Sequence, residues 1–177
     1  MIWIGTMTDN IIITFQWNYL DSAASLYERV YPVPHYGEHT AHDISREVIV
    51  GHVMRDSFIG VLAVNENQEV IGLAWGFAAP NDNTRLRELV IKKLGKEWVE
   101  NTFVIEAFAL DPDYAHTDLG ERLHTGLMDR VKESNYERMR VRLEIARMDR
   151  LPQTLVEQGW ATLQSLPHVV WMGTQVS

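Results

Sequence analysis

The sequence predicts an α/β protein: a mixed, mostly antiparallel sheet of about six to seven strands with helices on both faces. Runs of β-branched and aromatic residues alternate with segments whose apolar residues recur at helical spacing. Two neighbouring apolar runs are joined by a polar turn, which predicts an antiparallel hairpin. A strand-helix-strand unit follows, which predicts a parallel pair with a right-handed crossover. At 177 residues and 46% hydrophobic content, residues 1–177 are expected to form a single domain.

The composition excludes several classes of function. The absence of cysteine rules out disulfides, Cys-ligated zinc and thiol catalysis. A net charge of −8 argues against nucleic acid as a partner and is mildly compatible with a cationic substrate, although an ordinary acidic protein explains it equally well. No run of about 18 apolar residues and no signal peptide is recognisable, so we expect no membrane partner and a cytoplasmic location.

The first half of the chain predicts a strand, two helices and the hairpin. A turn at residues 65–68 joins the two strands of the hairpin. Asp21 or Ser22 is expected to cap the first helix, and Asp43 the second. The predicted elements are a strand at 11–17, helices at 20–31 and 41–57, and the hairpin at 57–80.

The second half begins with an amphipathic helix inserted near residues 83–95, where Gly95 is placed as a stop. A helix follows with Leu119, Leu123, Leu127 or Met128, and Val131 directed inward. The other predicted elements are strands at 102–110 and 138–147, a helix at 152–159 closed by Gly159, a short strand, and a final strand at 169–175.

The stretch "ALDPDYAHTDLGERL", residues 109–123, runs from a strand through a short turn into a helix. A strand that ends at a helix N-terminus leaves several backbone N–H groups pointing in one direction, and the helix dipole adds partial positive charge. A pyrophosphate fits that environment. The turn is therefore a candidate phosphate site.

The unit "FVIEAFALDPDYAHTDLGERLHTGLMDRV" resembles the acyl-coenzyme A binding core of the GNAT N-acetyltransferase superfamily. The segment "IEAFALDPDY" matches the strand and its exit, including Glu106, Pro112 and Tyr114. The order of elements is also that of the family over most of the chain, and Gly159-Trp160 match a Gly-Phe pair near the family's C-terminus. The inserted helix lacks a usual counterpart.

The resemblance implies the GNAT fold, acetyl-coenzyme A as acyl donor, and transfer to an amine of a small molecule or peptide. The family's Arg/Gln-x-x-Gly-x-Gly/Ala pattern keeps one of its three defining residues here, Gly120. The residues that the resemblance implies for acetyl-coenzyme A binding are Phe108, Ala109, Leu110, Ala115, His116, Thr117, Asp118, Leu119 and Gly120.

Asp118 places a carboxylate where pyrophosphate oxygens are expected, which costs energy if the charges approach closely. Two readings follow. Either Asp118 points outward or caps the helix, and the amides of residues 116–120 hold phosphate. Or the site has lost coenzyme A, and the chain is a catalytically silent GNAT-fold protein that serves as a sensor or interaction domain.

Acetyl transfer to an amine needs a base, a polarised thioester carbonyl and an acid for the thiolate. Glu106, inside an apolar strand, is the candidate base; a solvent-facing or cross-strand-paired glutamate is an equal alternative. A main-chain N–H near Phe108 or Ala109 is expected to polarise the carbonyl. At the position where the family often has a tyrosine that protonates the thiolate, this chain has Leu155, which cannot donate a proton.

The acceptor wall is expected to include Tyr31, His35 and Tyr36, because in the family the link between the first two helices borders the acceptor site. His35, Glu38, His39 and His42 are closely spaced, but no metal is predicted, since they lack a helical face and an HExxH pattern. Trp75, Trp98, Trp160 and Trp171 are expected to fill cores. The inserted helix and the final strand could each serve a homodimer.

Overall fold

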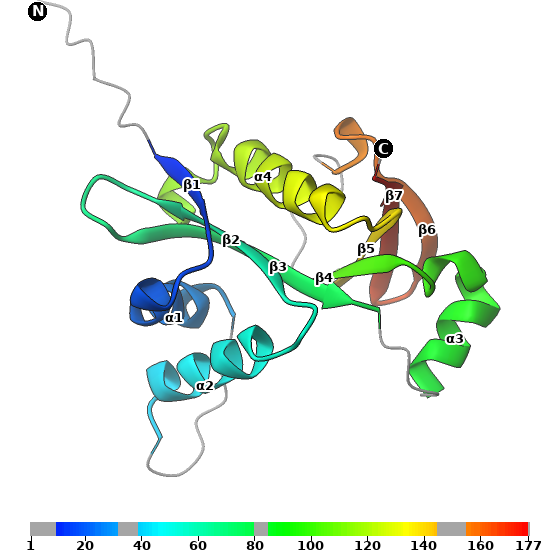
Figure 1. Cartoon of the computed structure of the whole chain (residues 1–177), viewed down its shortest axis with the longest axis horizontal. Coiled ribbons are helices and arrows are strands. Elements are labelled where there is room, and N and C mark those ends of the chain that lie inside the picture. Colours follow the sequence, from blue (N-terminus) through cyan, green and yellow to red (C-terminus); the bar gives the residue numbers. More distant parts are fainter. Residues whose placement is uncertain (1–9, 32–38, 80–84, 145–154, 177) are drawn as a thin grey trace, which may run out of the picture. The chain divides into compact units, whose positions relative to one another are not determined.

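The computed structural model describes residues 10–31, 39–79, 85–144 and 155–176. All seven strands belong to one sheet, in the order β1-β2-β3-β4-β5-β7-β6. The elements (Figure 1) are β1 (Ile11–Thr14), α1 (Leu20–Val30), α2 (Ala41–Val53), β2 (Ile59–Val64), β3 (Val70–Ala78), α3 (Arg85–Leu94), β4 (Thr102–Leu110), α4 (Leu119–Glu133), β5 (Arg138–Glu144), β6 (Ala161–Leu166) and β7 (Val169–Gln175). Short 3-10 turns lie at Trp17–Tyr19, Lys96–Trp98 and Pro112–Tyr114.

The chain divides into two compact units, residues 1–75 with 107–127 and residues 76–106 with 128–177. Strands β3 and β4 and helix α4 therefore contribute to both units. The predicted fold class is confirmed by the seven-stranded mixed sheet. The predicted hairpin is also present, because β2 and β3 are neighbours joined by a turn in which Asn65 N–H donates to Glu69 O at 3.0 Å.

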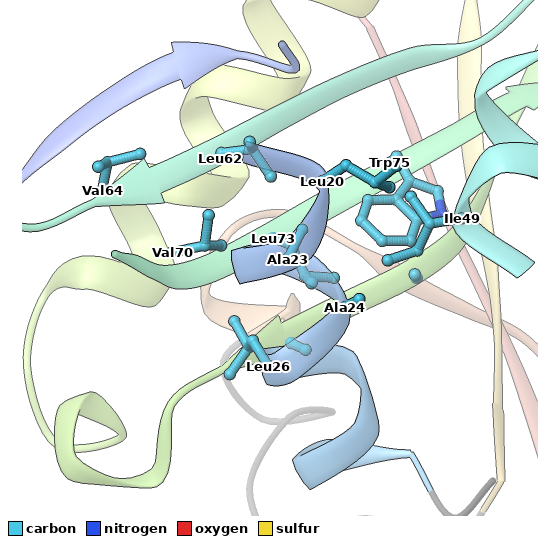
Figure 2. Packing of buried hydrophobic residues seen from close by; sticks show 12 residues of the cluster. Leu20, Ala23, Ala24, Leu26, Ile49, Leu62, Val64, Val70, Leu73 and Trp75 are labelled. Atoms are coloured by element: carbon cyan, nitrogen blue, oxygen red, sulfur yellow. The ribbon is translucent and has the colours of Figure 1, made fainter. Parts of the chain in front are cut away.

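The first unit has helices on both faces of its strands. Figure 2 shows the cluster on the α1 face, where Leu26 and its helix neighbours meet Leu62, Val64 and Trp75. Strand residues one position away point to the opposite face. There, a side chain added at Gly72 would lie 3.1 Å from Ala63 and 3.3 Å from Leu123 of α4.

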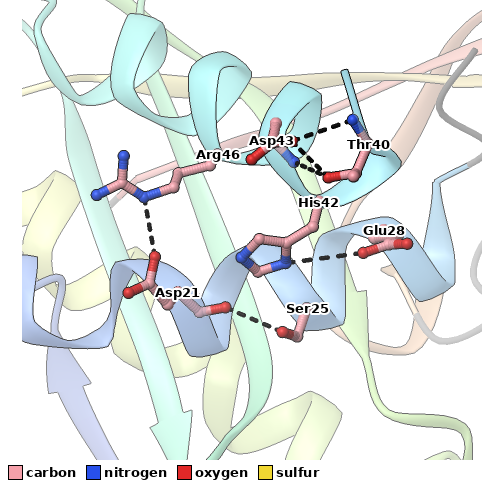
Figure 3. Close-up of polar contacts among 7 residues, drawn as sticks. All are labelled: Asp21, Ser25, Glu28, Thr40, His42, Asp43 and Arg46. Carbon is pink, nitrogen blue, oxygen red and sulfur yellow. Dashed lines mark hydrogen bonds and ion pairs between the residues drawn. The ribbon is translucent and has the colours of Figure 1, made fainter. Parts of the chain in front are cut away.

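Polar contacts join α1 to α2 along their exposed side. Figure 3 shows the ion pair between Arg46 and Asp21, with 2.8 Å between Nε and Oδ1, and Thr40 in a reciprocal capping arrangement with Asp43. The predicted caps are corrected by these contacts. Thr40, not Asp43, is the N-cap of α2, and Asp43 lies three residues later, where its carboxylate bonds the Thr40 N–H. Helix α1 has Tyr19 at its N-cap position and no side-chain cap.

The second unit combines a parallel and two antiparallel pairs. Strand β4 is parallel to β5, as predicted, while β7 is antiparallel to both β5 and β6. A helix is present in the described part of the range predicted for the inserted helix, as α3. Val90 of α3 packs in a cluster with Val99 and Trp171, and Trp98 lies against that cluster. Of the predicted helix at 152–159, residues 155–157 are helical and Gln158 and Gly159 form a turn, while residues 152–154 lie outside the described residues.

The inward face of α4 is confirmed, because Leu119, Leu123, Leu127 and Val131 are all 1% exposed or less. His124 is also buried, at 5% exposure. Burial lowers the pKa of His124 to about 4, because desolvation disfavours the imidazolium. The folded chain therefore holds this histidine neutral at a pH where the unfolded chain protonates it.

This buried histidine predicts loss of stability in mild acid. Between pH 6.5 and 4 the unfolded state binds a proton that the folded state does not, so stability falls as the pH falls through that window. The free energy of unfolding is expected to drop by about 2 kcal/mol between pH 7 and pH 5 on account of His124. Urea unfolding at the two pH values tests this, and His124→Gln should show a smaller difference. An equal difference in both proteins would contradict it.

Candidate active site

Strand β4 contains one more residue than the segment of β3 beside it. Asp111 N–H donates to Ile71 O at 2.8 Å, and Ala79 N–H donates to Thr102 O at 2.8 Å. Between these bonds β3 advances by eight residues and β4 by nine, as the residue numbers in the two bonds show. This extra residue is the signature of a β-bulge, which interrupts regular pairing and is frequent beside active sites.

The parallel register of β4 with β5 is also short. Within the described residues it runs from Thr102 opposite Arg138 to Ile105 opposite Val141. Strand β5 continues to Glu144 in its pairing with β7. Residues 106–108 of β4, for which the register would give described partners in β5, are therefore not paired with it. Glu106, the predicted base, is the first of them and is exposed.

The main chain of Phe108 is directed to the edge of β4 that faces away from β3. Ala107 and Ala109 share one core cluster, whereas Leu110 meets Gly72 and Gly120, so side chains alternate regularly here. Because Asp111 bonds β3, the main-chain groups of Ala109 also point to β3, and those of Phe108 point to the opposite edge. Of the two N–H groups expected to polarise a carbonyl, that of Phe108 points away from β3 and that of Ala109 points toward it.

The hydroxyl of Tyr31 occupies this edge. It accepts a hydrogen bond from Phe108 N–H and donates one to Phe108 O, both at 3.0 Å. A side-chain hydroxyl thus takes both main-chain groups that a neighbouring strand would otherwise pair. Tyr31 was predicted as an acceptor contact, and in the structure its hydroxyl is hydrogen-bonded to the main chain of β4.

Two sets of contacts hold Tyr31 in place. The ring of Tyr27 stacks on that of Tyr31, with 4.5 Å between centroids, and also lies parallel to Trp75 at 6.0 Å. Two residues before Tyr31, Arg29 forms an ion pair with Asp111, with 2.9 Å between Nη2 and Oδ2. The C-terminal end of α1 is therefore joined to β4 at Phe108 and to the residue directly after β4, Asp111.

Backbone amides are available at the N-terminus of α4. Within the described residues, the N–H of Thr117 donates to Tyr114 O and that of Leu119 to the Thr117 hydroxyl. Arg122 N–H donates to Asp118 O, the first bond of the helix. In the same part of the chain, four amides have no acceptor: those of His116, Asp118, Gly120 and Glu121. Such amides, at the positive end of a helix dipole, suit a phosphate.

The side chain that accepts a hydrogen bond from the start of α4 is that of Thr117. Thr117 supplies the side-chain oxygen that accepts from the helix, while the exposed Asp118 side chain makes no hydrogen bond or ion pair with any described residue. Asp118 stands at the N-cap position directly before Leu119, but the described capping acceptor is the Thr117 hydroxyl and not the Asp118 carboxylate. Gly120 lets the helix approach β4, because a Cβ there would lie 3.0 Å from Leu110 Cδ1.

The other predicted site residues fall into three groups. Ala115 and His116 are exposed in the turn, whereas the Leu119 side chain belongs to the core and only its backbone faces the turn. Leu155 is buried at 5% exposure, consistent with an apolar role. His35 and Tyr36 lie outside the described residues. Among the described residues, no three His, Asp or Glu side chains gather as a metal site would require.

A family model described as Acetyltransferase (GNAT) family matches residues 20–149. The chain belongs to the acetyltransferase (GNAT) family. The resemblance noted in the sequence is thereby confirmed, and the matched range includes α1, β4, the turn and α4 of this GNAT protein. A search among curated protein sequences finds no match. No helix within the described ranges is long and apolar enough to cross a membrane.

Solved structures of GNAT proteins share the fold at low identity. The ribosomal-protein-S18-alanine N-acetyltransferase from Escherichia coli is 13% identical, with a TM-score of 0.65 and coverage of 95% of this chain and 94% of that chain. An aminoglycoside 6'-N-acetyltransferase complexed with coenzyme A is 16% identical, with a TM-score of 0.68 and coverage of 94% and 97%. A GNAT N-acetyltransferase from Escherichia coli in complex with coenzyme A is 12% identical, with a TM-score of 0.67 and coverage of 97% and 84%.

Two features of this GNAT chain have no local signal in its sequence. The contact between Tyr31 and Phe108 joins positions 77 residues apart. The ion pair between Arg29 and Asp111 is similarly distant in the chain. Both contacts depend on how the end of α1 packs against β4, which no pattern within either segment records.

Proposed function

We propose that this GNAT protein is an acetyl-coenzyme A dependent N-acetyltransferase that acts on an amine of a small molecule or peptide. The observation that carries the proposal is the set of unbonded amides at the start of α4, those of His116, Asp118, Gly120 and Glu121, directly after the exit of β4. They offer donors to a pyrophosphate even though Ala115 replaces the family's arginine. The pantetheine arm would run along residues 108–110 of β4.

The reaction proposed at the site balances when solvent accepts the proton that Glu106 releases and supplies the proton that the thiolate takes up. The acceptor amine loses a proton to Glu106 and attacks the thioester carbon. The carbonyl oxygen gains negative charge, which the Phe108 N–H stabilises. The carbon–sulfur bond then breaks, the amide forms, and the thiolate takes up a proton. Two structural neighbours are named for their acceptors, a ribosomal-protein alanine and an aminoglycoside, and both acceptors are amines.

Calorimetric titration with acetyl-coenzyme A tests the proposal first. Saturable binding is expected, and no binding at millimolar ligand would contradict both an enzyme and a coenzyme A sensor. A thiol-release assay against a panel of amines, aminoglycosides and N-terminal peptides is the second step. Acceptor-dependent release supports the enzyme. Binding without release by any amine would favour the catalytically silent alternative, for which Ala115 and Leu155 are the evidence in the sequence.

Asp118→Asn is expected to tighten acetyl-coenzyme A binding. The Asp118 carboxylate is exposed at the start of α4, among the amides proposed to hold phosphate. Two like charges about 4 Å apart in water repel by about 1 kcal/mol, so removing one predicts an affinity gain of about fivefold. The gain should shrink as salt is added.

Asp129→Asn is the matched control for this prediction, because Asp129 is exposed on the same helix about 15 Å further along its axis. Its substitution should leave the affinity almost unchanged. Equal affinity of the wild type and the Asp118 variant, measured by calorimetry at low salt, would show that the carboxylate points away from the phosphates.

A further inference from the structure

The hydroxyl of Tyr31 is placed where the acyl group of the donor would bind. The Phe108 N–H has one hydrogen to donate, and in the structure it donates it to Tyr31 Oη at 3.0 Å. If a thioester carbonyl takes that N–H, as the proposed function requires, the hydroxyl has to leave this hydrogen bond. Its second hydrogen bond, to Phe108 O, does not compete with the carbonyl.

A hydroxyl that gives up only its hydrogen bond with the Phe108 N–H stays next to the thioester. The carbonyl oxygen and the sulfur are bonded to the same carbon, so a group one hydrogen bond from the Phe108 N–H is within reach of the sulfur as well. The tyrosine ring is restrained by its stacking on Tyr27, and its backbone end by the ion pair of Arg29 with Asp111. A small shift of the ring moves Oη off the Phe108 N–H, and rotation about the Cζ–Oη bond then turns the hydroxyl proton toward a new acceptor.

Other described residues are poorly placed to protonate the departing sulfur. Leu155, at the position where the family often has a tyrosine, is buried and has no proton to donate. Tyr19 bonds Gln68 in the hairpin turn, and Tyr136 packs edge-on against Phe103. Tyr114 lies in the 3-10 turn after β4. Tyr31 is the described tyrosine whose hydroxyl lies on the edge of β4.

We propose that Tyr31 is the general acid of the transfer, and that it acts from the end of α1 in place of the missing tyrosine at position 155. When the carbon–sulfur bond breaks, the electron pair stays on sulfur and the phenolic proton moves to it, which yields the coenzyme A thiol and a tyrosinate. The tyrosinate recovers a proton from solvent, and Glu106 releases the amine proton to solvent, so the cycle closes. This inference rests on the proposed function.

The first test measures contact with sulfur without any acceptor. Coenzyme A and desulfo-coenzyme A are titrated by calorimetry into the wild type, Tyr31→Phe and Tyr27→Phe. Tyr27→Phe is the matched control, since it removes a hydroxyl near the end of α1 but keeps the ring that stacks on Tyr31. The wild type and Tyr27→Phe are expected to prefer coenzyme A at least threefold, and Tyr31→Phe to show no preference. Thermal unfolding verifies that each variant is folded.

The second test uses turnover with an acceptor that the amine panel identifies. Tyr31→Phe is expected to lower kcat about 100-fold with KM for acetyl-coenzyme A little changed, while Tyr27→Phe stays within about threefold. Tighter acetyl-coenzyme A binding with unchanged kcat would make Tyr31 a mere competitor for the Phe108 N–H and overturn the inference. Equal affinity of the wild type for both coenzyme A forms would overturn it too, whereas no binding of either form would refute the proposed function itself.

Discussion

Replacing Glu106 by glutamine is expected to lower kcat for acetyl transfer by 10²–10⁴-fold, roughly the contribution of a positioned general base. Glutamine keeps the size and hydrogen-bonding length of the side chain but cannot accept the amine proton at neutral pH. Glu106 is exposed between two buried neighbours, Ile105 and Ala107, at the residue where the register with β5 has ended. An exposed carboxylate in an otherwise buried stretch is accessible to solvent and to an amine.

The measurement is a thiol-release assay under saturating acetyl-coenzyme A, with calorimetry to verify that donor binding is retained. Glu100→Gln is the matched control, because Glu100 is an exposed glutamate just before β4 whose ion pair with Lys96 lies on the surface. Surface pairs of this kind contribute little to stability. Turnover of the Glu106 variant equal to that of the control would remove Glu106 from the base role and leave the deprotonation to solvent.

The parts of the fold that the sequence predicted well are those governed by short periodicities. The inward face of α4 was predicted from leucines spaced by four residues, and all of them are buried, because a helix buries one stripe. The hairpin followed from two apolar runs around a polar turn. The parallel pair of β4 and β5 followed from the intervening helix.

The errors arose where several neighbouring residues could fill one structural position. Asp43 and Thr40 both suit an N-cap, and the choice depends on where the preceding chain turns. Helix α1 begins directly after a 3-10 turn at Trp17–Tyr19, so neither Asp21 nor Ser22 stands before its first residue. Element boundaries of this kind are set by a residue or two, which propensities alone do not resolve.

The candidate site was predictable only in its local part. The turn after β4 is one continuous stretch, so the hypothesis of a phosphate site at its amides could be made from the sequence. The bulge in β4 depends on counting β4 against β3, and the contact between Tyr31 and Phe108 depends on how α1 packs. Tertiary contacts of this kind leave no pattern in either segment by itself.

Replacing Gly76 by alanine is expected to destabilise the fold by about 3 kcal/mol or more, at the upper end of the usual cost of overpacking. Gly76 is buried in β3, and a Cβ there would lie 1.9 Å from the main-chain oxygen of Val104 and 2.9 Å from Phe103 Cε1. A flexible side chain could move aside, but a carbonyl oxygen of β4 cannot do so without shifting the strand that carries Glu106.

Gly51→Ala is the control that separates backbone crowding from the mere loss of a glycine. Gly51 is exposed in α2, and a Cβ there would meet nothing within 4 Å. Because alanine is the better helix former, this variant should be about 1 kcal/mol more stable than the wild type. Urea unfolding measures both changes. Equal stability of Gly76→Ala and the wild type would mean that β3 and β4 lie further apart than described, and the count that places the bulge in β4 would have to be abandoned.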